Sequence, residues 1–170
     1  MVGPHFQTWT HTLRNIDSVA STNLAHKLKP GFNAGDVVLL SGPIGSGKSH
    51  FARSLILSLL ADHGQVEDIP SPTFTLVQTY LAGDLEIWHS DLYRLSLLDE
   101  VLELGLLDAF TTALCLVEWP DRLGSAAPDD GLKLEFLLAK DPEMRHLTFS
   151  AQDPKWNWVK GVLNKVNLCD

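Results

Sequence analysis

The chain has few cysteines, with Cys115 and Cys169 as its only two among 170 residues. Disulfide scaffolds are denser in cysteine and structural zinc sites need more ligands at close spacing, so both classes of protein are excluded. Cys115 lies within an apolar run, ALCLVEW, and is expected to be a small buried hydrophobic side chain. With 45% hydrophobic residues, a chain of this length can instead be stabilised by an ordinary apolar core.

Long hydrophobic runs are also missing. No apolar stretch approaches the roughly 20 residues that a membrane-spanning helix needs, and the N-terminus has no apolar segment of the signal-peptide kind. Repeats, low-complexity segments and linker-like stretches are absent as well. We therefore expect one domain over residues 1–170, in the cytoplasm, with no membrane contact.

Positive charge is in short supply. The chain has 13 Lys and Arg against 21 Asp and Glu, which gives a formal net charge of −8. A stand-alone nucleic-acid binder typically carries a basic surface, and no dense cluster of Lys or Arg is present here. Direct binding of RNA or DNA as the main task is therefore disfavoured.

Buried strands alternate with helices along the chain. The runs at 37–41 (VVLLS) and 113–118 (ALCLVE) are short and apolar, which is typical of strands buried on both faces. Apolar residues at helical spacing predict an amphipathic helix from 48 to about 62. The pattern predicts an α/β fold with a mixed, largely parallel central sheet, flanked by helices and antiparallel hairpins. Further elements are expected as an edge strand at 8–16, a helix at 17–29, β-rich runs at 69–80 and 85–93, a helix broken near Gly105, a hairpin over 132–152 and a closing helix from 153.

Glycines are concentrated between the first buried strand and the helix that follows it. The segment GPIGSGKS, residues 42–49, matches the phosphate-binding P-loop, so the fold is expected to be of the P-loop NTPase type. Glycines let backbone N–H groups converge on an anion, and the helix start adds free N–H groups and the positive end of its dipole. Lys48 supplies a mobile charge for the β- and γ-phosphates, and the Ser49 hydroxyl supplies an oxygen ligand for Mg²⁺. A nucleoside triphosphate with Mg²⁺ is therefore the expected ligand. The phosphate-binding residues expected here are Gly42, Gly45, Ser46, Gly47, Lys48 and Ser49.

Two acidic residues end strand-like runs, where P-loop chemistry needs an acid near the metal. Asp91 ends EIWHSD and Glu118 ends ALCLVE. The second run is more apolar and stops cleanly before Pro120, so we assign Glu118 to Mg²⁺, through water. Asp91 is left with two functional roles, orienting the attacking water or holding a moving loop, and with a helix cap as the structural alternative.

Two further residues raise questions that the sequence leaves open. Thr73 follows prolines in SPTFT, where a loop could sense the γ-phosphate, although threonine in a strand is routine. Arg94 could reach a phosphate or pair with a surface carboxylate, which is the commoner case.

Five blocks of the chain together resemble the signature blocks of one family. In order and spacing, they are similar to those of the TsaE (YjeE) family, small bacterial ATPases of tRNA threonylcarbamoyladenosine synthesis. The resemblance covers roughly residues 17–150. The blocks are SGPIGSGKSHFAR, SPTFTLVQTY, WHSDLYRL, ELGLLDAF and CLVEWPDRL.

The resemblance implies an activity and partners. It implies ATP hydrolysis that is weak in the isolated chain and supported by a complex with the TsaD and TsaB proteins. Those two proteins transfer the threonylcarbamoyl group to adenosine 37 of tRNA, and this chain would help their cycle turn over. It would meet tRNA only indirectly through the complex, which suits the net charge of −8.

The resemblance also assigns residues. It makes Lys48, Asp91 and Thr73 the catalytic set, with Thr73 and Asp91 in two switch-like blocks. It gives Ser49 and Glu118 to the metal. It places Thr22 near the base, Arg145 on the nucleotide, and Trp119 beside the nucleotide or a partner.

The chain departs from the family pattern in the loop. It has Pro43-Ile44 where Asp-Leu is common, and Ser49 where threonine is commoner. Pro43 removes one N–H donor and fixes φ, while Ser49 keeps the hydroxyl. Both changes are compatible with ATP binding.

Two other functions remain open. A small P-loop kinase that phosphorylates a metabolite usually carries an arginine-bearing lid, and residues 121–150 hold only Arg122 and Arg145. A nucleotide-gated binding module without useful hydrolysis would need Lys48 for partner binding and would be indifferent to Asp91.

Overall fold

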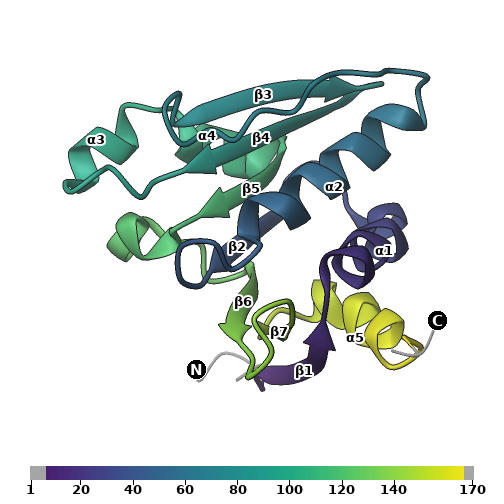
Figure 1. Cartoon of the computed structure of the whole chain (residues 1–170). Helices are drawn as coiled ribbons and strands as arrows, with labels where there is room; N and C mark the ends of the chain where they lie inside the picture. Colours follow the sequence, from purple (N-terminus) through teal and green to yellow (C-terminus); the bar gives the residue numbers. More distant parts are fainter. Residues whose placement is uncertain (1–6, 167–170) are drawn as a thin grey trace, which may run out of the picture.

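The computed structural model describes residues 7–166, which form a seven-stranded sheet with helices on both faces (Figure 1). The sheet order is β1-β7-β6-β2-β5-β4-β3. At the centre β6, β2, β5 and β4 run parallel, while β7, β1 and β3 are antiparallel to their neighbours. The predicted mixed sheet of P-loop type is thereby confirmed. The strands are β1 (Trp9–Ile16), β2 (Val37–Ser41), β3 (Val77–Ala82), β4 (Leu85–Asp91), β5 (Leu114–Glu118), β6 (Leu132–Leu138) and β7 (Arg145–Ala151).

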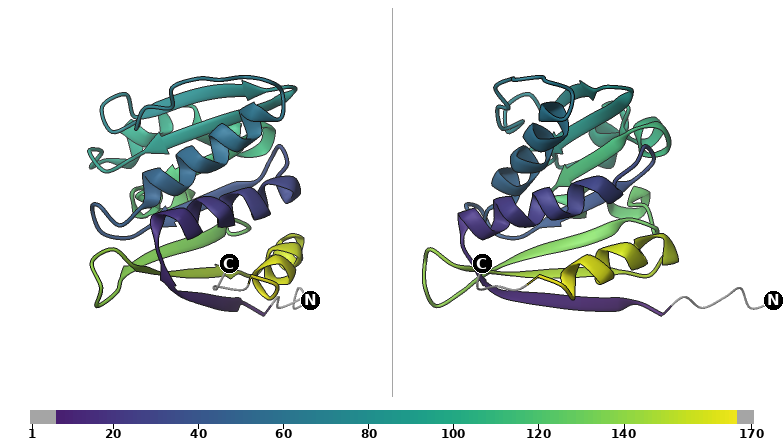
Figure 2. Two further views of the ribbon diagram at one scale, coloured as in Figure 1. Left: turned by 45° about the vertical axis from the view of Figure 1, so that its right-hand side comes forward. Right: turned by 90° about the vertical axis from the view of Figure 1, so that its right-hand side faces the viewer.

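The helices form two layers. Helices α1, α2 and α5 cover one face of the sheet and α3 and α4 cover the other (Figures 1 and 2). No helix within residues 7–166 has the length and apolarity needed to cross a bilayer. The helices are α1 (Ser18–Leu28), α2 (Lys48–Ala61), α3 (Leu98–Leu102), α4 (Leu106–Thr112) and α5 (Asn157–Leu163), with 3₁₀ turns at Lys29–Gly31, Pro120–Ala126 and Pro154–Trp156.

Local sequence signals set most element boundaries. Asp17 caps α1 by accepting a hydrogen bond from the Ala20 N–H at 2.7 Å. Gly105, with φ of 81°, separates α3 from α4, as predicted. Asp153 caps a 3₁₀ turn that begins with Pro154 and leads into α5.

One predicted element was wrong in part. The β-rich run over residues 69–80 becomes a strand only at Val77. Before that, the Leu76 N–H donates to the Pro72 carbonyl at 2.7 Å, which closes a turn, and Leu76 has a φ of 67°. The prolines therefore keep this segment as a loop that reaches the end of β4.

The central strands divide their side chains between two cores. In β2 and β5, Leu40 and Leu116 face the layer of α1, α2 and α5, and Leu39 and Val117 face α3 and α4. Cys115 lies fully buried in the second core as a free thiol, as predicted. Burial, and to a smaller extent the charge of Glu86, raises its pKa to about 12.

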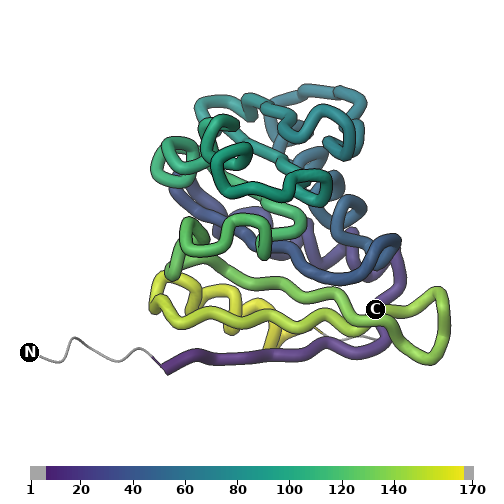
Figure 3. Tube along the Cα trace, turned by 90° about the vertical axis from the view of Figure 1, so that its left-hand side faces the viewer, coloured from purple at the N-terminus to yellow at the C-terminus, as the bar shows by residue number. Residues whose placement is uncertain are grey.

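Segments near both ends of the described chain pack into the core between the sheet and helices α1, α2 and α5. β1 lies along β7 at the sheet edge, although they come from opposite ends of the chain (Figure 3). Trp156 is fully buried. Its Nε1 donates to the Asp130 carbonyl at 2.6 Å, and its ring meets Phe32 edge-on at a centroid distance of 6.2 Å.

Replacing Trp156 tests this packing. Trp156→Ala removes the largest fully buried side chain among the described residues, together with its hydrogen bond to the Asp130 carbonyl. We expect the free energy of unfolding to fall by about 3–5 kcal/mol in urea denaturation. The exposed Leu138→Ala serves as the control and should stay within about 0.5 kcal/mol of the parent. Equal stability of the two variants would contradict the account.

Candidate functional site

The carboxyl ends of β2, β4 and β5 meet at one edge of the sheet, which is where open α/β sheets bind ligands. β2 leads directly into the glycine loop, and α2 begins at Lys48. In the parallel register, Asp91 at the end of β4 pairs with Glu118 at the end of β5, and Leu40 of β2 also pairs with Glu118. The topology therefore brings both candidate acids to the start of α2.

The glycine loop has a backbone that other residues would strain. Gly42, Gly45 and Gly47 have φ angles of 141°, 73° and 105°. A Cβ on Gly42 would lie 2.5 Å from the carbonyl oxygen of Phe136, whereas one on Gly45 would meet nothing within 4 Å. Gly42 is therefore required by packing, and Gly45 leaves open space beside the loop.

Lys48 is held inside this loop. Its ammonium donates to the carbonyls of Gly42 at 2.7 Å and Pro43 at 2.9 Å and lies 3.5 Å from the Ser46 hydroxyl. The ring of Trp119 covers it, with Nζ 4.5 Å from the ring centroid. Burial lowers the pKa of Lys48, and the charges of Glu118 and Asp91 partly oppose that shift.

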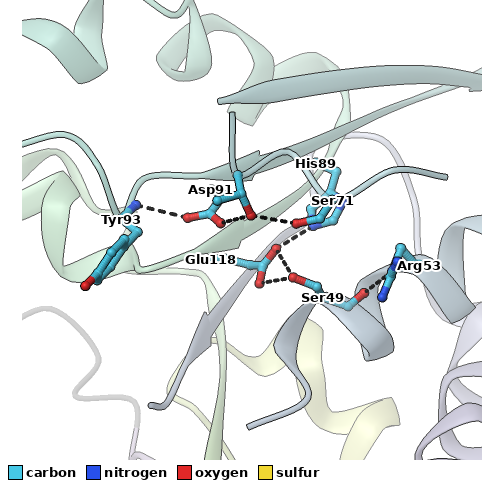
Figure 4. A network of polar contacts seen from close by, with 8 residues as sticks. Ser49, Arg53, Ser71, His89, Asp91, Tyr93 and Glu118 are labelled. Atoms are coloured by element: carbon cyan, nitrogen blue, oxygen red, sulfur yellow. Dashed lines mark hydrogen bonds and ion pairs between the residues drawn. The ribbon is translucent and has the colours of Figure 1, made fainter. Parts of the chain in front are cut away.

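Ser49 and Glu118 are joined directly, from α2 to β5. The Ser49 hydroxyl donates to the Glu118 carboxylate, at 2.7 Å from Oε1 and 3.0 Å from Oε2. The imidazole of His89, on β4, lies behind this pair with Nε2 2.8 Å from Glu118 Oε2 (Figure 4). Glu118 is only 2% exposed, so these contacts hold it in a nearly dry environment.

Asp91 connects the end of β4 to the loop before β3. Its Oδ2 accepts from the Thr73 hydroxyl at 3.2 Å, and the Thr73 hydroxyl in turn lies 2.8 Å from the Ser71 hydroxyl. Asp91 and Ser71 are labelled in Figure 4. Its Oδ1 accepts from the Tyr93 N–H at 3.0 Å. A turn follows β4 here, so Asp91 stabilises a turn and the loop, and the predicted alternative of a helix cap was wrong.

Arg145, at the start of β7, braces the glycine loop from the outside. Its guanidinium donates to the carbonyls of Ser46 at 3.1 Å and Gly45 at 3.0 Å, and also to those of Pro142 and Met144. It lines a cavity of about 360 Å³ beside the loop. The cavity is lined by Ile16, Asp17, Ser18, Ser21, Gly45, Ser46, Gly47, His50, Phe136, Pro142, Glu143, Arg145 and Leu147.

Thr22 is not among the residues that line this cavity, and its place near the base stays a prediction. Its hydroxyl lies between α1 and α2, 3.0 Å from His50 Nε2 and 3.2 Å from the Ser54 hydroxyl, and donates to the Ser18 carbonyl. Ser18 and Ser21 are the α1 residues that reach the cavity.

Sequence reasoning missed the roles of His89 and Ser71. His89 had a usable signal, because it lies two residues before Asp91 and strand alternation puts both on one face. Ser71 had none, since its contact with Thr73 depends on the loop conformation. Arg94 forms no ion pair with a carboxylate among residues 7–166, and its guanidinium lies over the Phe74 ring at 5.2 Å.

The donor set fits a phosphate-bound Mg²⁺. The loop leaves room beside Gly45, and α2 begins at Lys48, so the N–H groups of its first turn can bind an anion. Within residues 7–166 no three His, Cys, Asp or Glu side chains form a metal cage. Mg²⁺ on a nucleotide takes only one or two protein ligands, the others being phosphate oxygens and water, which Ser49 and Glu118 match.

A comparison with known protein families matches residues 16–147 to the model described as "Threonylcarbamoyl adenosine biosynthesis protein TsaE". The chain belongs to the TsaE family. The TsaE protein of Rickettsia conorii is 41% identical over 113 residues, 65% of this chain and 61% of that protein. The TsaE protein of Bacillus subtilis is 36% identical over 146 residues, 85% of this chain and 88% of that protein.

The fold agrees with a solved structure. The crystal structure of YdiB from Bacillus subtilis superimposes with a TM-score of 0.71 at 26% identity, covering 94% of this chain and 97% of that one.

The match with the Rickettsia felis TsaE protein spans only 53% of that relative's length. The matched segment of this chain therefore covers less than two thirds of the length of the Rickettsia conorii and Rickettsia felis proteins.

The two loop glycines allow a matched stability test. Gly42→Ala forces a Cβ against the Phe136 carbonyl at a positive φ, while Gly45→Ala meets only the positive φ. We expect unfolding free energies lower by about 3 kcal/mol or more for Gly42→Ala and about 1–2 kcal/mol for Gly45→Ala. Chemical denaturation measures both, and a larger loss for Gly45→Ala would refute the assignment of the tight contact.

Proposed function

We propose that this chain is the ATP-binding P-loop ATPase subunit of the tRNA threonylcarbamoyladenosine (adenosine 37) machinery, supporting turnover of a complex of TsaD and TsaB. One observation carries the proposal. In a chain of the TsaE family, the glycine loop, Lys48, Ser49, Glu118 and Asp91 converge at one edge of the sheet. The names of the relatives support a role in tRNA threonylcarbamoyladenosine synthesis. The convergence of these residues supports ATP binding and hydrolysis.

The loop and Lys48 would hold the phosphates of ATP. Bound ATP supplies the phosphoryl group to be transferred to water, and Mg²⁺ neutralises charge on it. Lys48 is already stripped of water by burial, and its ammonium is within 3 Å of two loop carbonyls. Turning it from those carbonyls toward a phosphate exchanges one set of oxygen acceptors for another.

Ser49 and Glu118 would hold the metal. Because the Ser49 hydroxyl donates its only hydrogen to Glu118, its lone pairs point away from the carboxylate and are free to bind a cation. Glu118 therefore has two tasks, fixing that hydroxyl and presenting negative charge to water in the metal's shell.

Asp91 and Thr73 would couple the site to the loop at 71–76. One oxygen of Asp91 holds the Thr73 hydroxyl and the other holds the backbone after β4. A water hydrogen-bonded to this carboxylate would be oriented for attack, and movement of Thr73 would change the position of the carboxylate.

The kinase alternative gains little support from the two arginines. Arg145 braces the loop carbonyls and Arg122 donates to the Tyr93 carbonyl at 3.4 Å, so both contact backbone. Neither lies on a hinged lid: residues 121–150 form a 3₁₀ turn and the β6–β7 hairpin.

The activity test is ATP hydrolysis by the purified chain, alone and with TsaD and TsaB. We expect slow hydrolysis alone and strong stimulation by the two proteins together. Binding of TsaD and TsaB without stimulation would support a nucleotide-gated module instead. Absence of binding, together with a phosphorylated metabolite in a substrate screen, would support the kinase.

Asp91→Asn separates chemistry from binding. The amide keeps the shape of the side chain but loses the charge that orients water. We expect ATP turnover to fall by about 100-fold or more with little change in ATP affinity. The exposed Asp84→Asn is the matched control and should hydrolyse ATP at the parent rate. Equal turnover in Asp91→Asn and the parent would remove Asp91 from the mechanism.

A further inference from the structure

His89 is a buried polar side chain for which the proposed chemistry gives no role. It is fully buried on β4, yet only one of its ring nitrogens has a hydrogen-bond partner within residues 7–166. That partner is Glu118, at 2.8 Å from Nε2, while Nδ1 is buried without any. Burial of a polar ring that makes one hydrogen bond is costly, so the bond to Glu118 is the feature that explains a histidine here.

The geometry determines the direction of this hydrogen bond. A carboxylate only accepts, so Nε2 carries the hydrogen and donates to Glu118 Oε2. The Ser49 hydroxyl donates to the same carboxylate from the opposite element, at 2.7 Å from Oε1. Glu118 is thus held between β4 and α2, with His89 behind it and Ser49 in front (Figure 4).

Fixing Glu118 also fixes Ser49. The orientation of the Ser49 hydroxyl follows the position of its acceptor, and the acceptor's rotation is limited by His89. Without the Nε2–H, a carboxylate that is 2% exposed loses one of its few donors and is free to rotate or recruit another group. The lone pairs of Ser49 would then no longer be held in one direction.

We propose that His89 is a positioning residue whose Nε2–H holds Glu118 so that Ser49 presents its lone pairs to Mg²⁺. The inference rests on the proposed function, since it concerns the metal of that same site. It assigns His89 an effect on the contribution of Mg²⁺ to nucleotide binding and none on the phosphate contacts of the loop. Residues that hold metal ligands in this way typically contribute about 10- to 100-fold in metal affinity or activity.

Two amide variants separate the hydrogen bond from the packing. In His89→Gln the amide nitrogen falls near the position of Nε2, so the donor to Glu118 is retained. In His89→Asn the amide reaches only the position of Nδ1, so the donor is lost with similar polarity. The measurement is the dissociation constant of a fluorescent ADP derivative in Mg²⁺ and in EDTA, with the thermal midpoint of each variant.

We expect the dissociation constants for ADP to differ between the two variants in Mg²⁺ and to be the same in EDTA. In Mg²⁺, His89→Asn binds ADP about 10-fold or more weakly than the parent, and His89→Gln stays within about 2-fold. In EDTA all three proteins bind ADP equally. Equal Mg²⁺ effects in His89→Asn and the parent would overturn the inference, and equal losses in both variants would assign the residue to packing.

The parent protein shows whether a failure lies in the proposed metal site or in the role of His89. If the parent itself shows no Mg²⁺ effect on ADP affinity, the proposed metal site fails and the inference with it. If the parent shows the effect, the inference stands only when His89→Asn loses Mg²⁺-dependent affinity and His89→Gln retains it.

If His89→Asn does not fold, the inference is tested by ¹⁵N-histidine NMR on the parent protein with bound ADP. The Nε2–H signal of His89 must shift when Mg²⁺ is added, and an unmoved signal would overturn the inference.

Discussion

The hydrogen bond from the Ser49 hydroxyl to the Glu118 carboxylate is the interaction on which the site depends. It joins the first turn of α2 to the end of β5, through two residues that lie 69 positions apart in the chain. The parallel pairing of β2 with β5 brings them together, because Leu40 just before the glycine loop is in register with Glu118. The register of β2 with β5 therefore determines where the glycine loop and the two proposed metal ligands lie relative to one another.

The same edge of the sheet carries backbone strain. Trp119, directly after Glu118, has a φ of 58°, which costs a non-glycine residue about 1–3 kcal/mol. That conformation places its ring over Lys48 and 4.7 Å from the ring of Tyr93. This conformation thus brings the Trp119 ring to the lysine and links the ends of β4 and β5 through a pair of aromatic rings.

The sequence predicted those features that depend on local pattern. Strands buried on both faces and the glycine loop have short, strong signals, so β2, α2 and β5 were found close to their observed bounds. Strand-end position was enough to bring Asp91 and Glu118 together, because parallel strands end at a common edge. The broken helix at Gly105 followed from one glycine in an apolar helical pattern.

Features that depend on tertiary contacts were not accessible in the same way. Whether Thr22 faces the cavity or the neighbouring helix depends on the rotation of α1, which its weak amphipathic pattern does not fix. Arg145 was predicted to contact the nucleotide, but its bracing of the loop carbonyls needs the β6–β7 hairpin to pack beside the loop. The contact of His89 with Glu118 needs two strands that are separated by α3 and α4 in the chain.

We propose this edge of the sheet as an Mg²⁺–ATP site organised by the Ser49–Glu118 bond. The most direct measurement is a crystal structure of the chain with Mg²⁺ and a non-hydrolysable ATP analogue. The account predicts Ser49 Oγ as a metal ligand that still donates to Glu118, with Lys48 turned from the Gly42 and Pro43 carbonyls to a phosphate. A structure with the phosphates outside the glycine loop, or with Mg²⁺ on ligands other than Ser49, would contradict it.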